Sequence, residues 1–598
     1  MQDWDLLDIP IENGKYTWSN KRIGPGHIAT RLDRCLVQSS FLLLGLETRL
    51  HILPCSVSDH KPIMLEMLAH KDLGPIPFRF NPLWVKDPEF LNMVQDSWKL
   101  PVKGSPFFIW EEKLRRLKTV LKSWAKTLPS PTNKRKQAQD RLAQHHAQSE
   151  DAEITKEVLD KEAKLQQTFH KACLSKEEHW RQKSRSLWLK AGDRNSAFFH
   201  KQAQARKSFN SIAKIKEGNL IHKDFGSIKR ATFNHFKNLY REEGVTDPNS
   251  KFLEAVPFMI SPLMNEHLEA RISIKEIKDA LSDMEPDKAP CPDGFTARFL
   301  QVCWQIVEKY LYKMVLKSQN CQKIGGNTNS AFLAFIPKEK GAKYFNRFHS
   351  ISLCNIGYKI ITKVIANRLK GILSTIIPEN QGGFVQGRQL TDNFILVQEV
   401  IHSSQLRKEK GMVIKLDLTN AFDRVRLSFL WEFLHKFGFG TGFINWIRAC
   451  VVDPWIAPLV NGRVAGFFKS SRGLRQGCPL SPLLFVLHVS VLSFYLDQKL
   501  VDQEILGLNI ARKVKNVNHT LFADDTLLLG AATIRTAANF KEVLDDYSEA
   551  TCSCLNKGKC KVFCWNISAS TLSAITRILG FSASLSWTSF TYLGLPIF

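Results

Sequence analysis

The chain has 598 residues and a mass of 68.3 kDa, more than one ordinary domain, so about two to four folded units are expected. A hydrophobic content of 44% with 23% charged residues is typical of a globular protein and excludes wholesale disorder. Lys and Arg outnumber Asp and Glu by 83 to 57, and the net charge of +26 favours a polyanionic partner, either nucleic acid or an anionic membrane.

The first residues argue against a signal peptide, and the lengths of the apolar runs argue against a membrane span. Residues 1–10 are acidic and lack the basic start and apolar run of a signal peptide. No uninterrupted apolar stretch reaches the roughly 18–20 residues that cross a bilayer. The longest candidate, 482–496, contains His488 and serines and is predicted to be a buried helix. We therefore expect an intracellular protein of the nucleus or cytoplasm without a membrane partner; the sequence gives no indication of its oligomeric state.

The chain divides into three parts with different residue patterns. Residues 1–70 are predicted to be rich in strands and turns. Residues 108–210 show helical spacing, broken by the Pro-Ser-Pro-Thr stretch at 129–132. From about residue 327, short β-rich runs alternate with helical stretches, which predicts an α/β arrangement.

Residues 181–240 carry 14 Lys or Arg against 3 Asp or Glu, and Trp188, Phe198, Phe199 and Phe209 lie among them. A solvated helical face over an ordinary core is the commoner reason for a charge run. With so strong a local bias, nucleic-acid contact is the favoured interpretation, and phosphate contacts of this kind are sensitive to salt.

The 13 cysteines are spread along the chain and are expected to be reduced. The one tight cluster is Cys552, Cys554, Cys560 and Cys564, whose C-x-C and C-x3-C spacing is not the usual zinc pattern. Ordinary thiols are the favoured interpretation.

Aspartates in two apolar, strand-like runs are the strongest chemical signal. Asp417 follows the run Ile-Lys-Leu, and Asp524 and Asp525 lie in the middle of LFADDTLLL. Burying carboxylates in such surroundings is costly unless they are paired or bind a metal, and adjacent like charges repel unless a cation lies between them. An isolated Asp-Asp pair would more often be a surface turn. The apolar hairpin and the third, upstream Asp instead favour a site for two Mg²⁺ ions, or Mn²⁺, that catalyses phosphoryl transfer.

Eight segments in the C-terminal half occur in a fixed order. They read AFIPKEKG, ISLCNIGYKIITKVIANRLK, QGGFVQGRQLTDN, KLDLTNAFDRV, SRGLRQGCPLSPLLF, LFADDTLLL, LNKGKCKVF and YLGLPI. In this order they resemble the reverse transcriptase of plant non-LTR retrotransposons of the long interspersed type. The resemblance covers about residues 330–598, and WLKAGDRNSAFFH and DKAPCPDGF extend it upstream. It implies an RNA-directed DNA polymerase that uses an RNA template, a DNA primer or target and dNTPs in target-primed reverse transcription.

The resemblance also assigns roles within the nucleotide site. Phe422 matches the aromatic that stacks under the incoming sugar and excludes a 2′-hydroxyl, although core packing alone would also explain it. Gln476 matches a residue lining the nucleotide and template pocket, with Gly477 allowing close backbone approach. Arg475 is expected either near phosphate or facing solvent.

Two lysines match the family's phosphate-binding positions. Lys338 resembles the lysine that holds the triphosphate, and Lys559 the lysine near the leaving pyrophosphate, a candidate proton donor. The family's FRPISL reads FHSISL here, so His349 and Ser350 replace an Arg and a Pro, and Arg347 is a candidate substitute for that Arg. Further departures from the family pattern are Cys291, Gln386 and Asn420.

Residues 16–65 resemble the end of an endonuclease/exonuclease/phosphatase domain, on the segments YTWSN, RLDRCLV and SDHKPI. The resemblance implies His60 as the catalytic imidazole, Asp33 as the group that orients it and Asp59 as a metal ligand. The family's other catalytic residues belong to an N-terminal half that this sequence lacks, so we expect no DNA nicking by this chain alone.

These observations predict an α+β multidomain protein with the fingers and palm of a right-hand polymerase, an antiparallel palm sheet and a nearly absent thumb. The expected units are an endonuclease remnant with a partial α/β sandwich (1–70), a helical basic extension (71–265), the start of the fingers (266–330) and fingers with palm (331–598). A catalytically weak relic that only binds RNA or DNA is the alternative function. A splicing maturase-like role is a third, disfavoured by the endonuclease-like segment.

Overall fold

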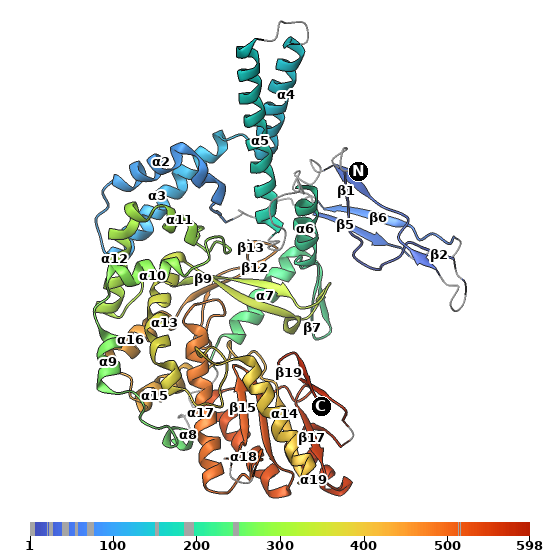
Figure 1. The fold of residues 1–598 in the computed structure, drawn as a ribbon, viewed down its shortest axis with the longest axis vertical. Coiled ribbons are helices and arrows are strands. Elements are labelled where there is room, and N and C mark those ends of the chain that lie inside the picture. Colours follow the sequence, from blue (N-terminus) through green and yellow to red (C-terminus); the bar gives the residue numbers. More distant parts are fainter. Residues whose placement is uncertain are drawn as a thin grey trace.

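The structure is a computed structural model. It describes residues 6–20, 22, 28–38, 47–53, 58–68, 77–149, 155–184, 196–242, 250–511, 514, 516–585 and 587–598. Trp188 and most of the segment WLKAGDRNSAFFH lie outside these residues. The chain forms a mixed α/β structure of several sheets and helical layers (Figure 1).

The first described residues form short antiparallel strand pairs, as the turn-rich sequence predicts. The strands are β1 (Leu6–Asp8), β2 (Trp18–Ser19), β3 (Ala29–Thr30), β4 (Leu36–Gln38), β5 (Glu47–Ile52) and β6 (Ile63–Leu68). They pair as β1 with β4, β2 with β3 and β5 with β6. Their buried cluster, among the described residues, consists of Ile9, Ile11, Leu50 and Ile52. This small core joins the rest of the chain where the Lys340 ammonium donates to the Ile11 carbonyl at 2.8 Å.

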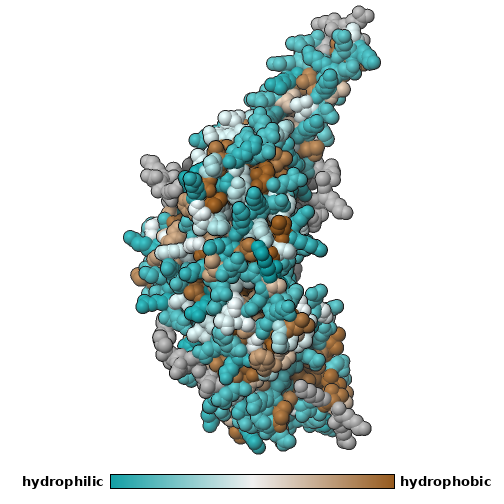
Figure 2. Space-filling model, turned by 90° about the vertical axis from the view of Figure 1, so that its left-hand side faces the viewer, coloured by the Kyte–Doolittle hydropathy of each residue, from teal (hydrophilic) through white to brown (hydrophobic). Residues whose placement is uncertain are grey.

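Helices dominate the next part of the chain. They are the 3₁₀ turn η2 (Pro82–Lys86), α2 (Pro88–Lys99), α3 (Pro106–Thr127), α4 (Pro131–Ser149), α5 (Lys156–Ser184) and α6 (Ser196–Phe209). Both α2 and α3 begin with a capping residue followed by proline: Asp87 accepts from Glu89 N, and Ser105 accepts from Phe108 N. The break predicted at 129–132 separates α3 from α4. Helices α4 and α5 form a hairpin that projects from the molecule (Figure 1), and the coloured part of the face seen in Figure 2 is largely hydrophilic.

A hairpin and further helices follow. They are β7 (Ile215–Glu217), β8 (Leu220–His222), α7 (Phe225–Leu239), α8 (Ser250–Glu254), α9 (Pro262–Glu269), α10 (Ile274–Ser282), α11 (Ala297–Val302) and α12 (Trp304–Cys321). Ile228, Phe236 and Tyr240 of the basic stretch belong to a buried cluster with Leu333 and Ile456. The end of the basic stretch is thus part of a folded core.

Two five-stranded sheets carry the C-terminal half. The first has the order β10-β9-β12-β13 with β14 also on β12, and the second has the order β15-β16-β11-β17-β18. The second is antiparallel except that β18 runs parallel to β17. The strands are β9 (Ser330–Pro337), β10 (Phe348–Cys354), β11 (Gly411–Leu416), β12 (Trp455–Val460), β13 (Arg463–Val464), β14 (Phe468–Lys469), β15 (His519–Phe522), β16 (Asp525–Ala531), β17 (Lys561–Trp565), β18 (Ser582–Ser584) and the hairpin β19 (Phe590–Tyr592) with β20 (Leu595–Ile597).

Helices back these sheets. They are η3 (Phe345–Arg347), α13 (Ile356–Ile376), α14 (Leu390–Leu406), α15 (Leu427–Phe437), α16 (Thr441–Val451), α17 (Ser481–Val501), α18 (Ile534–Thr551) and α19 (Ala569–Leu579). One buried hydrophobic cluster contains residues between Phe78 and Phe581, so it spans the predicted domain boundaries at residues 265 and 330. The proposed domain boundaries therefore stay predictions.

Helix α17 confirms the buried helix predicted around 482–496. Among the described residues it is the one helix long and apolar enough to cross a membrane, but 67% of its most apolar window is buried inside the protein. Its central side chains, including Val486 to Ser493, are all buried. An apolar helix that is buried in this way is typical of a protein core.

His488 is a polar side chain at the centre of α17. It is buried beside the Phe429 ring, and neither ring nitrogen finds a hydrogen-bond partner within the described residues. Burial lowers the pKa of His488 to about 4, because the charged form loses its hydration. The structure therefore holds a neutral imidazole that destabilises the core.

We expect His488→Leu to raise stability and to flatten its dependence on pH. Because the folded pKa of His488 lies below the unfolded value of about 6.5, the unfolded chain takes up the proton first. Stability is then lost as the pH falls from about 6.5 to about 4, by up to about 3 kcal/mol. Urea unfolding of both proteins at pH 8 and pH 5 measures this. His435→Leu, at an exposed position on neighbouring α15, is the control; equal pH dependence in wild type and His488→Leu contradicts the prediction.

Candidate active site

The three aspartates singled out in the sequence lie at one edge of the second sheet. Asp417 directly follows β11, and Ala523 and Asp524 form the two-residue turn between β15 and β16, with Asp525 opening β16. In the β11–β16 register Leu416 faces Thr526, so the next pair along the strands is Asp417 and Asp525. The chain thus brings together carboxylates more than a hundred residues apart.

The negative charges at this edge interact. The pKa of Asp525 is raised by partial burial, by the neighbouring Asp524 and by Asp417. The aspartates are more accessible than the apolar sequence suggested: Asp524 and Asp525 are exposed, and Asp417 is half-buried. Partial burial of the Asp525 carboxyl and charge repulsion are therefore together the physical reasons for a cation here.

The donor set fits Mg²⁺ bound jointly with a substrate. No three or more His, Cys, Asp or Glu side chains converge closely enough to hold a metal by themselves in the part of the chain that the structure describes. Mg²⁺ does not need such a cage, because it commonly takes one or two carboxylates and completes its shell with water and substrate phosphate. Asp417, Asp524 and Asp525 are the residues that would hold it.

Cationic side chains flank the aspartates. The Lys559 ammonium lies 3.5 Å from a carboxylate oxygen of Asp417. Lys559 is placed there because Asn556 N donates to the Asp417 carbonyl at 2.8 Å and Thr419 N donates to the Cys554 carbonyl at 2.8 Å. The cysteine cluster likewise lies beside Asp417, whose N–H points at the Cys560 sulfur at 3.4 Å.

The loop between β9 and β10 supplies further positive charge. The pKa of Lys338 is lowered by partial burial and by the charge of Lys559, so the two ammonium groups repel each other. Lys338 also donates to the Asn346 carbonyl at 3.1 Å. Arg347, at the same loop, is exposed and lies 3.7 Å from Glu339.

Phe422 and Gln476 lie on segments that meet, because Leu474 N donates to the Phe422 carbonyl at 2.7 Å. The half-buried Phe422 ring stacks on Phe485 with centroids 4.2 Å apart. The Gln476 carbonyl accepts from Ser352 N of β10 at 2.7 Å. Gly477 has φ of +101°, and a Cβ there would lie 2.8 Å from the Ser352 carbonyl oxygen, so the close approach at this glycine is to β10.

The comparison with known protein families identifies the domain that contains this sheet edge. Residues 336–597 match the family model of the reverse transcriptase (RNA-dependent DNA polymerase). The chain carries a reverse transcriptase domain.

Relatives of the chain come from mobile elements. An uncharacterised 149 kDa protein of transposon TX1 from Xenopus laevis is 24% identical over 573 residues, which is 93% of this chain and 43% of the relative. A retrovirus-related Pol polyprotein of the type-2 retrotransposable element R2DM from Drosophila melanogaster is 26% identical over 274 residues, 46% of this chain and 24% of the relative. The chain thus spans less than half the length of these relatives.

Within the reverse transcriptase domain, Arg475 does not face solvent, so that expectation is wrong, and its place near phosphate stays a prediction. It is 5% exposed, donates to Asn329 Oδ1 at 2.7 Å and to the Cys450 carbonyl, and covers the Tyr358 ring at 4.0 Å. Its guanidinium links Asn329, directly before β9, with Cys450 of α16 and Tyr358 of α13.

A buried network that the sequence did not indicate lies one residue beyond Phe422. The Tyr240 hydroxyl donates to Asp423 at 2.6 Å, and the Ser350 hydroxyl donates to the same carboxyl at 3.3 Å. Burial raises the pKa of Asp423 to about 6, and the two hydrogen bonds oppose this shift. Ser350, where the family has proline, therefore has a partner, whereas His349 beside it is exposed. No spacing pattern could have linked a tyrosine at the end of α7 with this carboxyl.

Two of the other departures from the family pattern have a local structural explanation. Asn420 has φ of +50°, a region that asparagine tolerates better than most residues. Cys291 is buried, with the Lys359 ammonium 3.2 Å from its sulfur. Gln386 is exposed.

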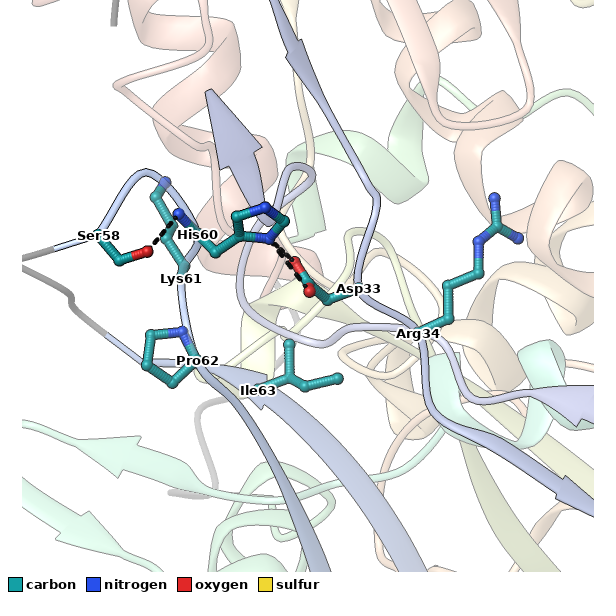
Figure 3. A pocket seen from close by; sticks show the side chains of 7 residues that line it. All are labelled: Asp33, Arg34, Ser58, His60, Lys61, Pro62 and Ile63. Atoms are coloured by element: carbon teal, nitrogen blue, oxygen red, sulfur yellow. Dashed lines mark hydrogen bonds and ion pairs between the residues drawn. The ribbon is translucent and has the colours of Figure 1, made fainter. Parts of the chain in front are cut away.

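The N-terminal segment places two of its three predicted residues, Asp33 and His60, together (Figure 3). His60 Nδ1 lies 2.9 Å from Asp33, and the pKa of Asp33 is lowered chiefly by this hydrogen bond. Asp59 points elsewhere, accepting from Trp18 Nε1 at 2.7 Å. Asp33 and His60 line a shallow pocket of about 400 Å³ together with Arg34, Ser58, Lys61, Pro62 and Ile63.

Proposed function

We propose that the chain is the RNA-directed DNA polymerase of a non-LTR retrotransposon. The observation that carries this proposal is the meeting of Asp417 with the Asp524–Asp525 turn at one sheet edge, faced by Lys338 and Lys559. An acidic edge next to positive side chains suits a nucleotide whose phosphates bind cations on both sides. In this proposal the second sheet is the palm, β9 and β10 belong to the fingers, and the partners are an RNA template, a DNA primer and dNTPs.

Each side chain has one task in the proposed reaction. Asp417, Asp524 and Asp525 hold divalent cations, which would activate the primer 3′-hydroxyl and stabilise the leaving oxygen. Lys338, with Arg347 beside it, binds the triphosphate. Lys559, close to Asp417, is placed to give a proton to the departing pyrophosphate.

The remaining residues shape the nucleotide pocket. Phe422, fixed against Phe485, limits the space at C2′ of the sugar, and Gln476 lines the pocket beside the template. Catalysis is then mainly alignment and electrostatic stabilisation. The His60–Asp33 pair is proposed as the remnant of an endonuclease site. We also propose an intracellular location.

Primer extension on poly(rA)/oligo(dT) with Mg²⁺ tests the proposal. Incorporation of dTMP that needs the template and the divalent ion supports a polymerase. RNA binding without incorporation supports the alternative, a relic that keeps the fold alone. Incorporation that persists with EDTA contradicts the metal-dependent mechanism.

Exposed cations on α6 are proposed to contact nucleic-acid phosphate. Lys201, Arg206 and Lys207 are exposed on this helix. Replacing all three by alanine is expected to weaken the salt dependence of RNA binding. The slope of log K, where K is the association constant for single-stranded RNA, against log salt becomes shallower by about 0.7 for each phosphate that the variant no longer neutralises. Filter binding between about 50 and 200 mM salt measures the slope.

The matched control removes three exposed lysines from α12, Lys309, Lys313 and Lys317. Equal slopes for both triple variants would contradict the assignment of α6. Deletion of residues 181–240 would remove Phe236 and Tyr240 from a buried core, so it would disturb the fold as well as remove positive charge.

A further inference from the structure

The turn that carries Asp524 has an unfavourable backbone conformation. Ala523, its first residue, has φ of +56°. Glycine is preferred at such a position in a two-residue hairpin turn, because a Cβ is strained there. This conformation persists only where surrounding contacts determine it. The contacts of Ala523 therefore control where the two carboxylates lie.

The side chain of Gln381 supplies the decisive contact. Its Oε1 accepts from Ala523 N at 2.9 Å and from Gly383 N at 2.9 Å. Gln381 is 0% exposed, so water does not compete for either N–H group. One oxygen atom thus joins the turn to a loop about 140 residues earlier in the chain.

Backbone hydrogen bonds also join the loop to the strand that leads into the turn. Gly382 N donates to the Leu521 carbonyl at 2.8 Å, and Leu521 N donates to the Asn380 carbonyl at 2.8 Å. A Cβ on Gly383 would lie 2.5 Å from Ala523 N. The loop therefore needs glycine at 383 to come close enough for the Gln381 side chain to reach the turn.

The loop is itself fixed to a long helix. Arg388 donates to the Gln381 carbonyl at 2.7 Å and to the Ile377 carbonyl, at the end of α13, at 2.8 Å. A guanidinium suits this position because carbonyl groups are unpaired at a helix C-terminus. The position of the turn is thus set by α13 through Arg388 and Gln381.

We propose that Gln381 is a positioning residue that holds the Ala523 N–H and thereby fixes Asp524 and Asp525 for catalysis. The catalytic consequence rests on the polymerase function proposed above. The clamp itself is a property of the chain without substrate and can be measured separately.

Hydrogen–deuterium exchange of the full chain tests the clamp without any activity. In Gln381→Met, which has a similar size but no acceptor, exchange at Ala523 is expected to be about two- to tenfold faster, the effect of removing one hydrogen bond. Gln381→Glu keeps an acceptor oxygen and is expected to retain the protection. Gln398→Met, a glutamine on α14 that contacts Phe598, is the control.

Primer extension then tests the catalytic consequence. Gln381→Met is expected to lower kcat about tenfold or more with little change in KM for dTTP, because the phosphate-binding cations lie on other segments. Adding Ala523→Gly is expected to restore part of kcat, since glycine adopts the positive φ without help. A residue with a merely structural role would not give this rescue.

Each outcome decides between the alternatives. Unchanged exchange at Ala523 in Gln381→Met overturns the proposal, as does an equal loss of protection in Gln381→Glu. If Gln381→Met fails to fold, the exchange of Gln381→Glu decides. Faster exchange in Gln381→Met, together with a wild-type chain that incorporates no dTMP, supports the clamp and counts against the polymerase function.

Discussion

Asp524→Asn is expected to abolish RNA-templated primer extension. Asparagine keeps the size of the side chain but removes one negative charge from the edge shared with Asp417 and Asp525. A divalent cation contributes several kcal/mol to the stabilisation of the transition state. Each 1.4 kcal/mol corresponds to a factor of ten, so we expect kcat/KM for dTTP to fall by about 10³-fold or more.

Steady-state dTMP incorporation at several Mg²⁺ concentrations measures this effect. Asp545→Asn is the matched control: Asp545 is exposed on α18 and forms an ion pair with Lys541, away from the sheet edge. Its activity is expected to stay within about twofold of wild type, the usual effect of an exposed surface ion pair. Comparable losses in the two variants, or an active Asp524→Asn enzyme, would rule out the aspartate site.

The sequence predicted those features that depend on local pattern. The apolar run before Asp417 and the apolar residues around Asp524 predicted strands and a hairpin, and β11, β15 and β16 confirm them. The apolar run at 482–496 predicted a buried helix, which α17 confirms. These predictions succeed because side-chain periodicity and strong apolar runs determine which face is buried.

The sequence did not predict two of the contacts that join distant segments of the fold. The hydrogen bond between Tyr240 and Asp423 joins residues 183 positions apart, and a helix-ending tyrosine has no distinctive spacing. Arg475 lies in a motif with polar neighbours, yet tertiary packing buries it over Tyr358. Composition tells which residues are costly to bury but not where the compensating partner lies.

The exposure of the aspartates illustrates the same limit. An apolar run around Asp524 suggested a buried carboxylate, but the predicted hairpin turn brings the side chain to the surface. A strand pattern fixes which residues share a face but does not give the exposure of a residue in the turn between two strands. The roles of Lys338, Lys559 and Phe422 rest on motif order and stay predictions.

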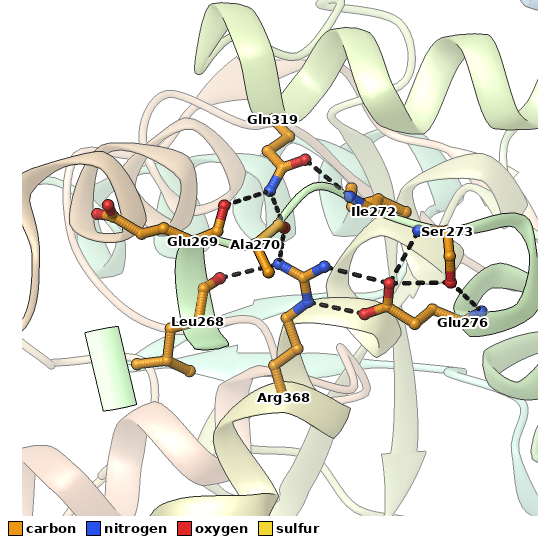
Figure 4. Close-up of polar contacts among 8 residues, drawn as sticks. All are labelled: Leu268, Glu269, Ala270, Ile272, Ser273, Glu276, Gln319 and Arg368. Atoms are coloured by element: carbon orange, nitrogen blue, oxygen red, sulfur yellow. Dashed lines mark hydrogen bonds and ion pairs between the residues drawn. The ribbon is translucent and has the colours of Figure 1, made fainter. Parts of the chain in front are cut away.

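Arg368→Met is expected to be the most destabilising single change proposed outside the site. Arg368 of α13 is 5% exposed and forms a two-point ion pair with Glu276 of α10, at 2.8 and 3.2 Å. It also donates to the Leu268 and Ala270 carbonyls at the end of α9, at 2.9 and 2.6 Å (Figure 4). Removing one partner of such a buried pair costs about 3–5 kcal/mol, and the partial exposure of Glu276 favours the lower end of this range.

Arg298→Met is the matched control for this prediction. Arg298 also binds one carboxylate, Asp287, through two nitrogen atoms, but its side chain is 35% exposed. Because water screens and replaces an exposed pair, the loss is expected to be at most about 1 kcal/mol. Urea unfolding of both variants measures the difference. Equal losses would mean that burial does not strengthen the Arg368 contacts, whereas a larger loss in Arg368→Met identifies this arginine as a residue that holds α9 and α10 against α13.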